Sequence, residues 1–268
     1  MDIFGMHRAV IDDYQSYVKS FLTIADQRIR ELVDTKLLAE DGICPDALVQ
    51  LNPGFEQGPT VEDLVAEGVL HPECSRIFRD REGRSLRLYR HQEQAIRKAC
   101  DGRNFVVTSG TGSGKSLTYL IPVVDHILRS GPGDSSVRAI LVYPMNALIN
   151  SQLEALSRFL SLQGQDGPQI RADEYTGQKS RSQKNQVQTS PPHIILTNYV
   201  MLELMLTRPG GEERFIDKKK QAKIEFLVLD ELHTYRGRQG ADVALLIRRL
   251  RERCDNSDLR CIGTSATM

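Results

Sequence analysis

The sequence has no apolar run approaching the roughly eighteen residues that a membrane-spanning helix requires. Its first residues, which include Asp2, Asp12 and Asp13, lack the basic-then-apolar pattern of a secretory signal. The five cysteines form no CxxC pair and have no closely spaced histidine partners, so the sequence does not indicate a zinc site. We therefore expect a soluble, cytoplasmic protein with no membrane partner.

An excess of charge is also missing, because 35 Lys and Arg residues balance 35 Asp and Glu residues. Any affinity for nucleic acid must therefore come from a local surface and not from bulk charge. The chain does have length and apolar content. With 268 residues, of which 40% are hydrophobic, it is long enough for one α/β domain of roughly 150 to 200 residues and an appendage.

The pattern of the sequence changes near residues 81–85. Residues 1–82 begin with apolar side chains at three- and four-residue steps, which predicts a helical extension that continues into a loop-rich connector. Residues 83–268 alternate short apolar strands with helical stretches, as in a parallel sheet flanked by helices. The predicted strands are 104–108, 139–143, 170–175, 193–197, 226–229 and 260–264, and the predicted helices are 60–67, 115–128, 147–160 and 241–253.

A glycine-rich segment, residues 109–116, follows an apolar strand and opens a helix. Converging backbone N–H groups at a helix N-terminus bind phosphate oxygens, Lys115 is placed to reach the outer phosphates, and Ser116 is suited to bind Mg²⁺. A flexible glycine turn is the alternative, although the sequence GSGKS between strand and helix is restrictive. The predicted nucleotide-binding residues of this loop are Thr111, Gly112, Ser113, Gly114, Lys115 and Ser116.

The apolar strand 226–229 ends in two adjacent carboxylates, Asp230 and Glu231. Ligands of α/β sheets bind at the carboxyl ends of the strands. Asp230 is suited to hold Mg²⁺, and Glu231 to orient and deprotonate the water that attacks in phosphoryl transfer. Such a pair alone is more often a solvated turn or a helix cap. Together with the phosphate loop it predicts an ATPase or GTPase with Lys115, Asp230 and Glu231 as its catalytic residues.

The order of the short motifs resembles that of the superfamily 2 DEXH/DEAD-box helicases. The matching segments are 88–92, which resembles the Q motif, 109–116, 143–148, 176–178, 197–199, 230–233 and 265–267. The stretch from His233 to Arg251 is similar, more specifically, to the MrfA/YprA-like branch of these enzymes. The resemblance covers roughly residues 86–268, and it implies a single RecA-like P-loop domain that forms the first motor lobe of an ATP-dependent helicase or translocase.

The resemblance also implies roles for single residues. Tyr89 and Gln92 would bind adenine, which favours ATP over GTP as the cofactor with Mg²⁺. His233, Ser265 and Thr267 would couple the nucleotide to a nucleic-acid partner, for which the family favours DNA. The residues placed to contact the nucleic-acid backbone are Pro144, Asn146, Gly177, Gln178, Thr197 and Asn198. Taken singly, small polar residues after strands are more often helix caps and turns.

Two departures from the family pattern are Leu232, in the third position of the acidic motif, and Met145, where threonine is common. We expect the chain to be truncated after residues 265–267, with a second RecA-like lobe supplied by the full-length protein or a partner chain. Without the arginines of that lobe, ATP hydrolysis should be slow. Two alternatives stay open: a non-unwinding ATP-binding scaffold or subunit of a DNA repair or defence complex, and a P-loop kinase or GTPase.

Overall fold

The computed structural model describes residues 2–37, 54–110, 112–133, 135–164, 169–208 and 223–266. The chain divides into two compact units, Met1–Gly54 and Phe55–Met268. The first unit contains the helices α1 (Ile3–Ser20) and α2 (Gln27–Leu32) and the π-helical turn η1 (Val33–Leu37), so the predicted helical extension is present. No helix within the described ranges is long and apolar enough to cross a membrane.

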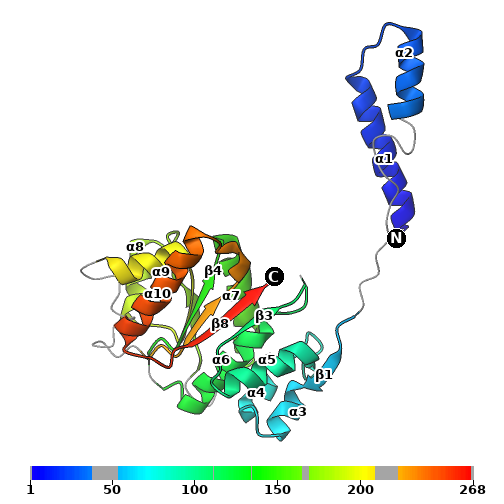
Figure 1. Cartoon of the computed structure of the whole chain (residues 1–268). Coiled ribbons are helices and arrows are strands. Elements are labelled where there is room, and N and C mark those ends of the chain that lie inside the picture. The colour runs from blue at the N-terminus through cyan, green and yellow to red at the C-terminus, as the bar shows by residue number, and fades with distance from the viewer. Residues whose placement is uncertain are drawn as a thin grey trace. The chain divides into compact units, whose positions relative to one another are not determined.

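The second unit contains the parallel sheet and the helices that cover it (Figure 1). Its strands are β1 (Gln57–Thr60), β2 (Arg87–Tyr89), β3 (Phe105–Thr108), β4 (Ala139–Tyr143), β5 (Ala172–Glu174), β6 (Ile194–Asn198), β7 (Phe226–Leu229) and β8 (Arg260–Ser265). Its helices are α3 (Val61–Ala66), α4 (Pro72–Ile77), α5 (Arg90–Cys100), α6 (Leu117–Ser130), α7 (Asn146–Leu160), α8 (Arg181–Thr189), α9 (Tyr199–Thr207), η3 (Leu232–Thr234) and α10 (Arg238–Cys254).

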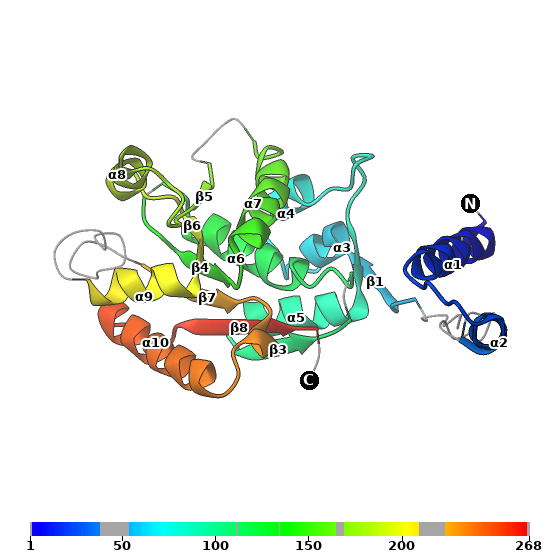
Figure 2. The same ribbon diagram turned by 90° about the horizontal axis from the view of Figure 1, so that it is seen from above.

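Six strands form one parallel sheet in the order β3-β8-β7-β4-β6-β5, and β1 pairs with β2 in a separate antiparallel ribbon. The side chains of β4 alternate between two cores, since Leu141 packs on the side of α5, α6 and α7, and Ile140 and Val142 pack on the side of α8, α9 and α10. Figure 2 shows α6 and α7 on one side of the strands and α9 and α10 on the other. Because both faces are covered, the central strands β4 and β7 are apolar throughout.

The predicted fold is confirmed, with strands 139–143 and 226–229 at their predicted bounds. The helix predicted at 60–67 is α3, and Thr60 and Asp63 form a capping box at its start. Among the strands, the least accurate prediction is 170–175, where β5 spans only Ala172–Glu174, the residues that pair with β6.

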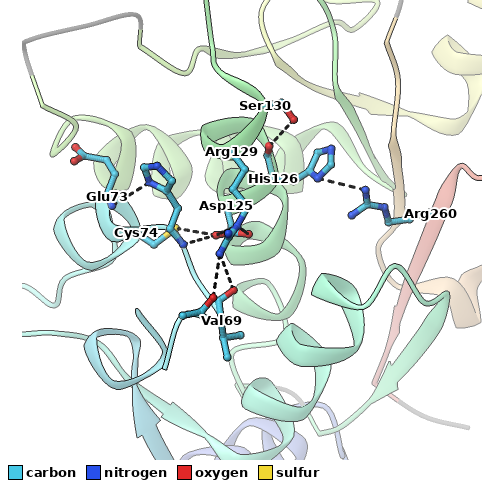
Figure 3. A network of polar contacts seen from close by, with 10 residues as sticks. Val69, Glu73, Cys74, Asp125, His126, Arg129, Ser130 and Arg260 are labelled. Carbon is cyan, nitrogen blue, oxygen red and sulfur yellow. Dashed lines mark hydrogen bonds and ion pairs between the residues drawn. The ribbon is translucent and has the colours of Figure 1, made fainter. Parts of the chain in front are cut away.

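Residues 55–85 pack into the second unit. Leu64, Cys74 and Phe78 are fully buried in the same core as α5 and α6. Asp125 of α6 anchors this segment by accepting a hydrogen bond from the His71 N–H at 2.5 Å and from Arg129, which itself donates to backbone carbonyls of the segment (Figure 3). The second unit therefore begins before the boundary expected near residues 81–85, because these contacts join residues 55–85 to α5 and α6.

Candidate active site

The glycine-rich loop lies between β3 and α6, at the carboxyl end of the sheet. Gly112 and Gly114 have φ angles of +77° and +69°, which side chains with a Cβ rarely adopt. A Cβ at Gly114 would also lie 2.5 Å from Gln92 Nε2, so any other residue there would displace the Gln92 amide as well as strain the backbone. The loop is tied to the sheet, because the Ser109 N–H donates to the Ser265 carbonyl on β8 at 3.2 Å.

Lys115 points its ammonium group at the loop's own backbone. Its Nζ donates to the Ser109 carbonyl at 2.8 Å and to the Gly110 carbonyl at 3.0 Å, and it has no ion-pair partner among the residues that the structure describes. The Ser113 hydroxyl is buried and, within the described chain, has no hydrogen-bond partner. An anion at the loop would satisfy both groups more strongly than the present contacts do.

The acidic pair follows β7 directly. The Asp230 N–H continues the sheet by donating to the Val142 carbonyl at 2.9 Å, and Glu231 then takes the left-handed conformation, with φ 51° and ψ 49°. A non-glycine residue in this region costs of order 1 kcal/mol and marks a place where the surrounding structure fixes the backbone. Thr264 of β8 fixes this one, because its hydroxyl donates to the Asp230 carboxylate and accepts from the Glu231 N–H at 3.2 Å.

His233 lies beside Glu231 and Ser265. Its Nδ1 is 3.3 Å from the Ser265 hydroxyl and 3.2 Å from Glu231 Oε2, although this carboxylate oxygen is buried without a hydrogen bond of good geometry to any described residue. Of the predicted coupling residues, His233 thus contacts the predicted base, and Ser265 contacts His233.

Burial raises the pKa of Asp230, and the neighbouring charge of Glu231 adds to this effect. The Thr264 hydrogen bond and the charge of Lys115 oppose the increase without cancelling it. Two conclusions follow. First, Asp230 carries an incompletely compensated charge, which favours binding of a cation. Second, Lys115 lies close enough to Asp230 to affect its pKa. The two motifs converge because the strands that precede them, β3 and β7, are both neighbours of β8.

Gln92, the residue expected to bind adenine, is buried against the phosphate loop. Its Oε1 accepts the Tyr89 N–H at 2.8 Å, and its Nε2 donates to the carbonyls of Ser113 and Gly114 at 3.2 and 2.9 Å. The neighbouring His91 Nε2 is 3.1 Å from the same Ser113 carbonyl. In this arrangement the Gln92 amide supports the loop, and adenine recognition by it stays a prediction.

The turns after β4 and β6 lie side by side, since Tyr143 and Asn198 are in register at the ends of these strands. The Asn198 side chain donates to Asn146 Oδ1 at 2.8 Å and accepts the Met201 N–H at the start of α9. A shared hydrogen bond therefore holds two of the three predicted nucleic-acid turns together, those after β4 and β6.

The remaining predicted contacts differ in exposure. Gly177 and Gln178 are exposed in the turn after β5, and Pro144 is half-buried. Thr197 is fully buried, and its hydroxyl donates to the Tyr175 carbonyl at 2.6 Å, so we expect it to position the turn and not to touch nucleic acid itself. Thr111 and Thr267 lie outside the described residues.

Sequence reasoning missed three residues that shape the site: Thr264, His91 and Tyr119. Thr264 directly precedes the motif at 265–267, and the pairing of β7 with β8 brings it to Asp230. Tyr119 lies in the first turn of α6 and is fully buried behind the acidic pair, where Asp230 raises its pKa after the larger effect of burial. Only the strand order carries the signal that would have found Thr264.

A phosphate loop and paired carboxylates at the carboxyl end of one parallel sheet define a P-loop nucleotide-binding protein. Residues 89–268 match the family model for DEAD/DEAH box helicases, and the chain belongs to this family.

Among curated proteins, the ATP-dependent helicase YprA of Bacillus subtilis is 34% identical over 183 residues, which cover 68% of this chain and 23% of YprA. The Druantia protein DruE of Escherichia coli is 25% identical, over 98% of this chain and 20% of its own length. A crystal structure of the DUF1998 helicase MrfA bound to DNA and AMPPNP aligns with a TM-score of 0.66 and 29% identity, over 81% of this chain and 28% of that one. These matches confirm the resemblance to the MrfA/YprA-like branch. The chain spans about a fifth to a quarter of the curated relatives' length.

Proposed function

We propose that this chain is the ATP-binding first motor lobe of an ATP-dependent helicase or translocase that acts on nucleic acid. The observation that carries the proposal is the convergence of Lys115 with the acidic pair, which places a cation for phosphates and a carboxylate for a metal at one edge of the sheet. The family match and the AMPPNP-bound relative support ATP as the nucleotide. A cytoplasmic location stays a prediction.

The described residues fit a triphosphate with Mg²⁺. To phosphate oxygens the loop offers backbone N–H groups, the Lys115 ammonium, which has no ion-pair partner among the described residues, and the Ser113 hydroxyl, which has no hydrogen-bond partner among them. Ser116 and Asp230 offer the oxygen ligands that Mg²⁺ prefers. Bound magnesium would neutralise the charge that develops on the transferred phosphoryl group. Lys115 would exchange its two carbonyl contacts for phosphate oxygens.

Glu231 is the proposed general base. Its Oε2 makes no hydrogen bond of good geometry to a described residue, so it can accept a proton from an attacking water. Its strained backbone, held by Thr264, fixes the direction in which the side chain leaves the strand. His233 contacts both this carboxylate and Ser265 at the end of β8. We assign His233 and Ser265 to coupling, because they connect the base to the next strand of the sheet.

The proposed nucleic-acid surface consists of the turns after β4, β5 and β6. Asn146, Gly177, Gln178 and Asn198 are exposed or half-buried there and offer amide and backbone donors to phosphates, which would position a strand without reading its sequence. DNA is the preferred partner, because MrfA, to which this chain is similar, has been crystallised with DNA.

The decisive experiment measures nucleotide competition and nucleic-acid binding by the purified chain. A fluorescent ATP analogue should bind with Mg²⁺ and be displaced by ATP but poorly by GTP, and a labelled DNA single strand should bind more tightly than the matching RNA. A preference for GTP would contradict the helicase interpretation and favour another P-loop enzyme.

Hydrolysis and unwinding need a second lobe. An arginine supplied across the interface between lobes contributes about 10³ to 10⁵ in rate, so this chain alone should turn over ATP slowly. Brisk, DNA-stimulated turnover by the isolated chain would contradict that expectation. Strand displacement by protein that carries both lobes distinguishes a helicase from a non-unwinding ATP-binding subunit.

A further inference from the structure

Two buried tyrosines connect the proposed nucleotide site to the proposed nucleic-acid surface. Tyr119 lies three residues after Ser116 in the first turn of α6, and Tyr143 is the last residue of β4, directly before Pro144. Both side chains are fully buried, and their hydroxyl oxygens are 3.2 Å apart. The Tyr119 N–H donates to the Ser116 carbonyl at 3.3 Å, so Tyr119 belongs to the helical turn that begins at Ser116.

We propose that the Tyr119–Tyr143 hydroxyl pair positions the turn after β4 in response to the ligand held at Ser116, and so couples nucleotide binding to nucleic-acid binding. This inference rests on the proposed function. It gives Tyr119 and Tyr143, which are fully buried, a role in coupling in addition to their packing in the core.

Packing alone would favour phenylalanine at both positions. The two rings lie in an apolar core with Ile121, Leu141 and Ile149, where a hydroxyl group costs free energy unless it is hydrogen-bonded. Burial raises the pKa of both tyrosines, so both hydroxyls stay protonated and act only as donors and acceptors. The two hydroxyl groups therefore depend on each other for a hydrogen bond, a requirement that phenylalanine at both positions would not have.

The coupling follows from the position of Tyr119 in the first turn of α6. A ligand that shifts Ser116 also shifts the Tyr119 hydroxyl and, through the hydrogen bond between the two tyrosines, Tyr143. Tyr143 continues into Pro144, whose ring restricts the backbone, so a movement of Tyr143 is passed to Asn146. The 2.8 Å hydrogen bond between Asn146 and Asn198 then extends the movement to the turn after β6.

The test compares isosteric variants of the 268-residue chain. The affinity for a fluorescein-labelled oligothymidylate is measured by anisotropy with and without Mg·AMPPNP, and the ratio of the two dissociation constants gives the coupling. We expect Tyr119→Phe and Tyr143→Phe each to reduce the ratio by about fivefold, which is the equivalent of one neutral hydrogen bond. Tyr175→Phe removes a hydroxyl from a fully buried ring bonded to Gln188, and it should leave the ratio unchanged.

The double variant Tyr119→Phe/Tyr143→Phe separates coupling from stability. Removing one hydroxyl leaves the other unsatisfied and should lower the melting temperature, whereas removing both should restore it. The coupling ratio should stay low in the double variant, with no further loss beyond the single variants. A wild-type ratio in the double variant, or a ratio of one in the wild type, would overturn the inference. Absence of AMPPNP binding to the wild type would instead refute the proposed function on which it rests.

Discussion

Two carboxylates, Glu225 and Asp230, flank the buried strand β7, and their pKa values are shifted in opposite directions. Glu225 immediately precedes β7, where its Oε2 is 2.8 Å from His126 Nε2 and 3.3 Å from Arg138. Burial raises the pKa of Glu225, but the hydrogen bonds and charges of His126 and Arg138 outweigh burial, and the pKa is lowered. Asp230 immediately follows β7, has no ion pair within the described part of the chain, and has a raised pKa.

The difference indicates a structural role for the carboxylate at the amino end of β7 and a ligand-binding role for the carboxylate at its carboxyl end. At the amino end of the sheet the protein supplies its own cations, and Arg260 also packs over the Phe226 ring at 4.5 Å. At the carboxyl end the charge of Asp230 is left incompletely compensated, with Lys115 close by but bonded to backbone carbonyls. A carboxylate that the fold does not neutralise is a candidate for binding a ligand that does.

The largest expected effect is that of Glu231→Gln on hydrolysis. In protein that carries both lobes, this change should leave ATP binding within a factor of about two and reduce kcat by about a thousandfold, the typical contribution of a general base. Steady-state turnover and equilibrium binding measure the two quantities. Glu225→Gln at the other end of β7 is the matched control and should leave kcat unchanged. Normal turnover by Glu231→Gln would show that another group is the base.

Lys115→Ala should weaken binding of Mg·ATP to this chain by about a hundredfold, because it removes a charged donor from the phosphates. Titration with a fluorescent nucleotide measures the loss. Lys98→Ala, on the exposed face of α5, removes the same charge at a distance and should bind like the wild type. Equal affinity of the wild type and Lys115→Ala would show that the loop does not hold the phosphates.

Glu225→Gln should destabilise the fold by about 2 kcal/mol, because it weakens hydrogen bonds to a charged group and leaves Arg138 buried with a weaker partner. The stabilising contribution of Glu225 also depends on pH. Since its folded pKa lies below the ordinary value of 4.5, the contribution is complete above that pH and is lost as the pH falls through the folded pKa. Urea unfolding between pH 3 and 7 should therefore show a smaller acid loss in the variant than in the wild type.

The smallest expected effect is that of Asp230→Asn on stability, and it is opposite in sign to that of Glu225→Gln. Because the folded pKa of Asp230 is raised, its charge destabilises the unliganded fold at neutral pH, and the cost disappears as the pH falls below the folded pKa. Asp230→Asn should stabilise the chain by about 1 kcal/mol at pH 7 while weakening the effect of Mg²⁺ on nucleotide binding. Thermal unfolding without ligand measures the gain, and destabilisation by Asp230→Asn would remove the contrast with Glu225.

Much of the fold could be predicted because it is encoded locally. The strands at 139–143 and 226–229 are short apolar runs bounded by polar residues, and the capping box at Thr60 involves neighbours three residues apart. The phosphate loop was also readable, since its glycines and Lys115 act within eight consecutive residues. The strand β5 was predicted less well, since only its three residues Ala172–Glu174 pair with β6.

The sequence by itself determined the six strands of the parallel sheet, the phosphate loop and the acidic pair, because each is a pattern of adjacent residues. The tertiary structure alone decided that Thr264 holds Asp230, that Gln92 supports the loop, and that Glu225 is neutralised while Asp230 is not. Each of these contacts joins residues at least 21 positions apart. Their meeting depends on which strands become neighbours, and that choice is made by packing of the whole sheet between its two layers of helices.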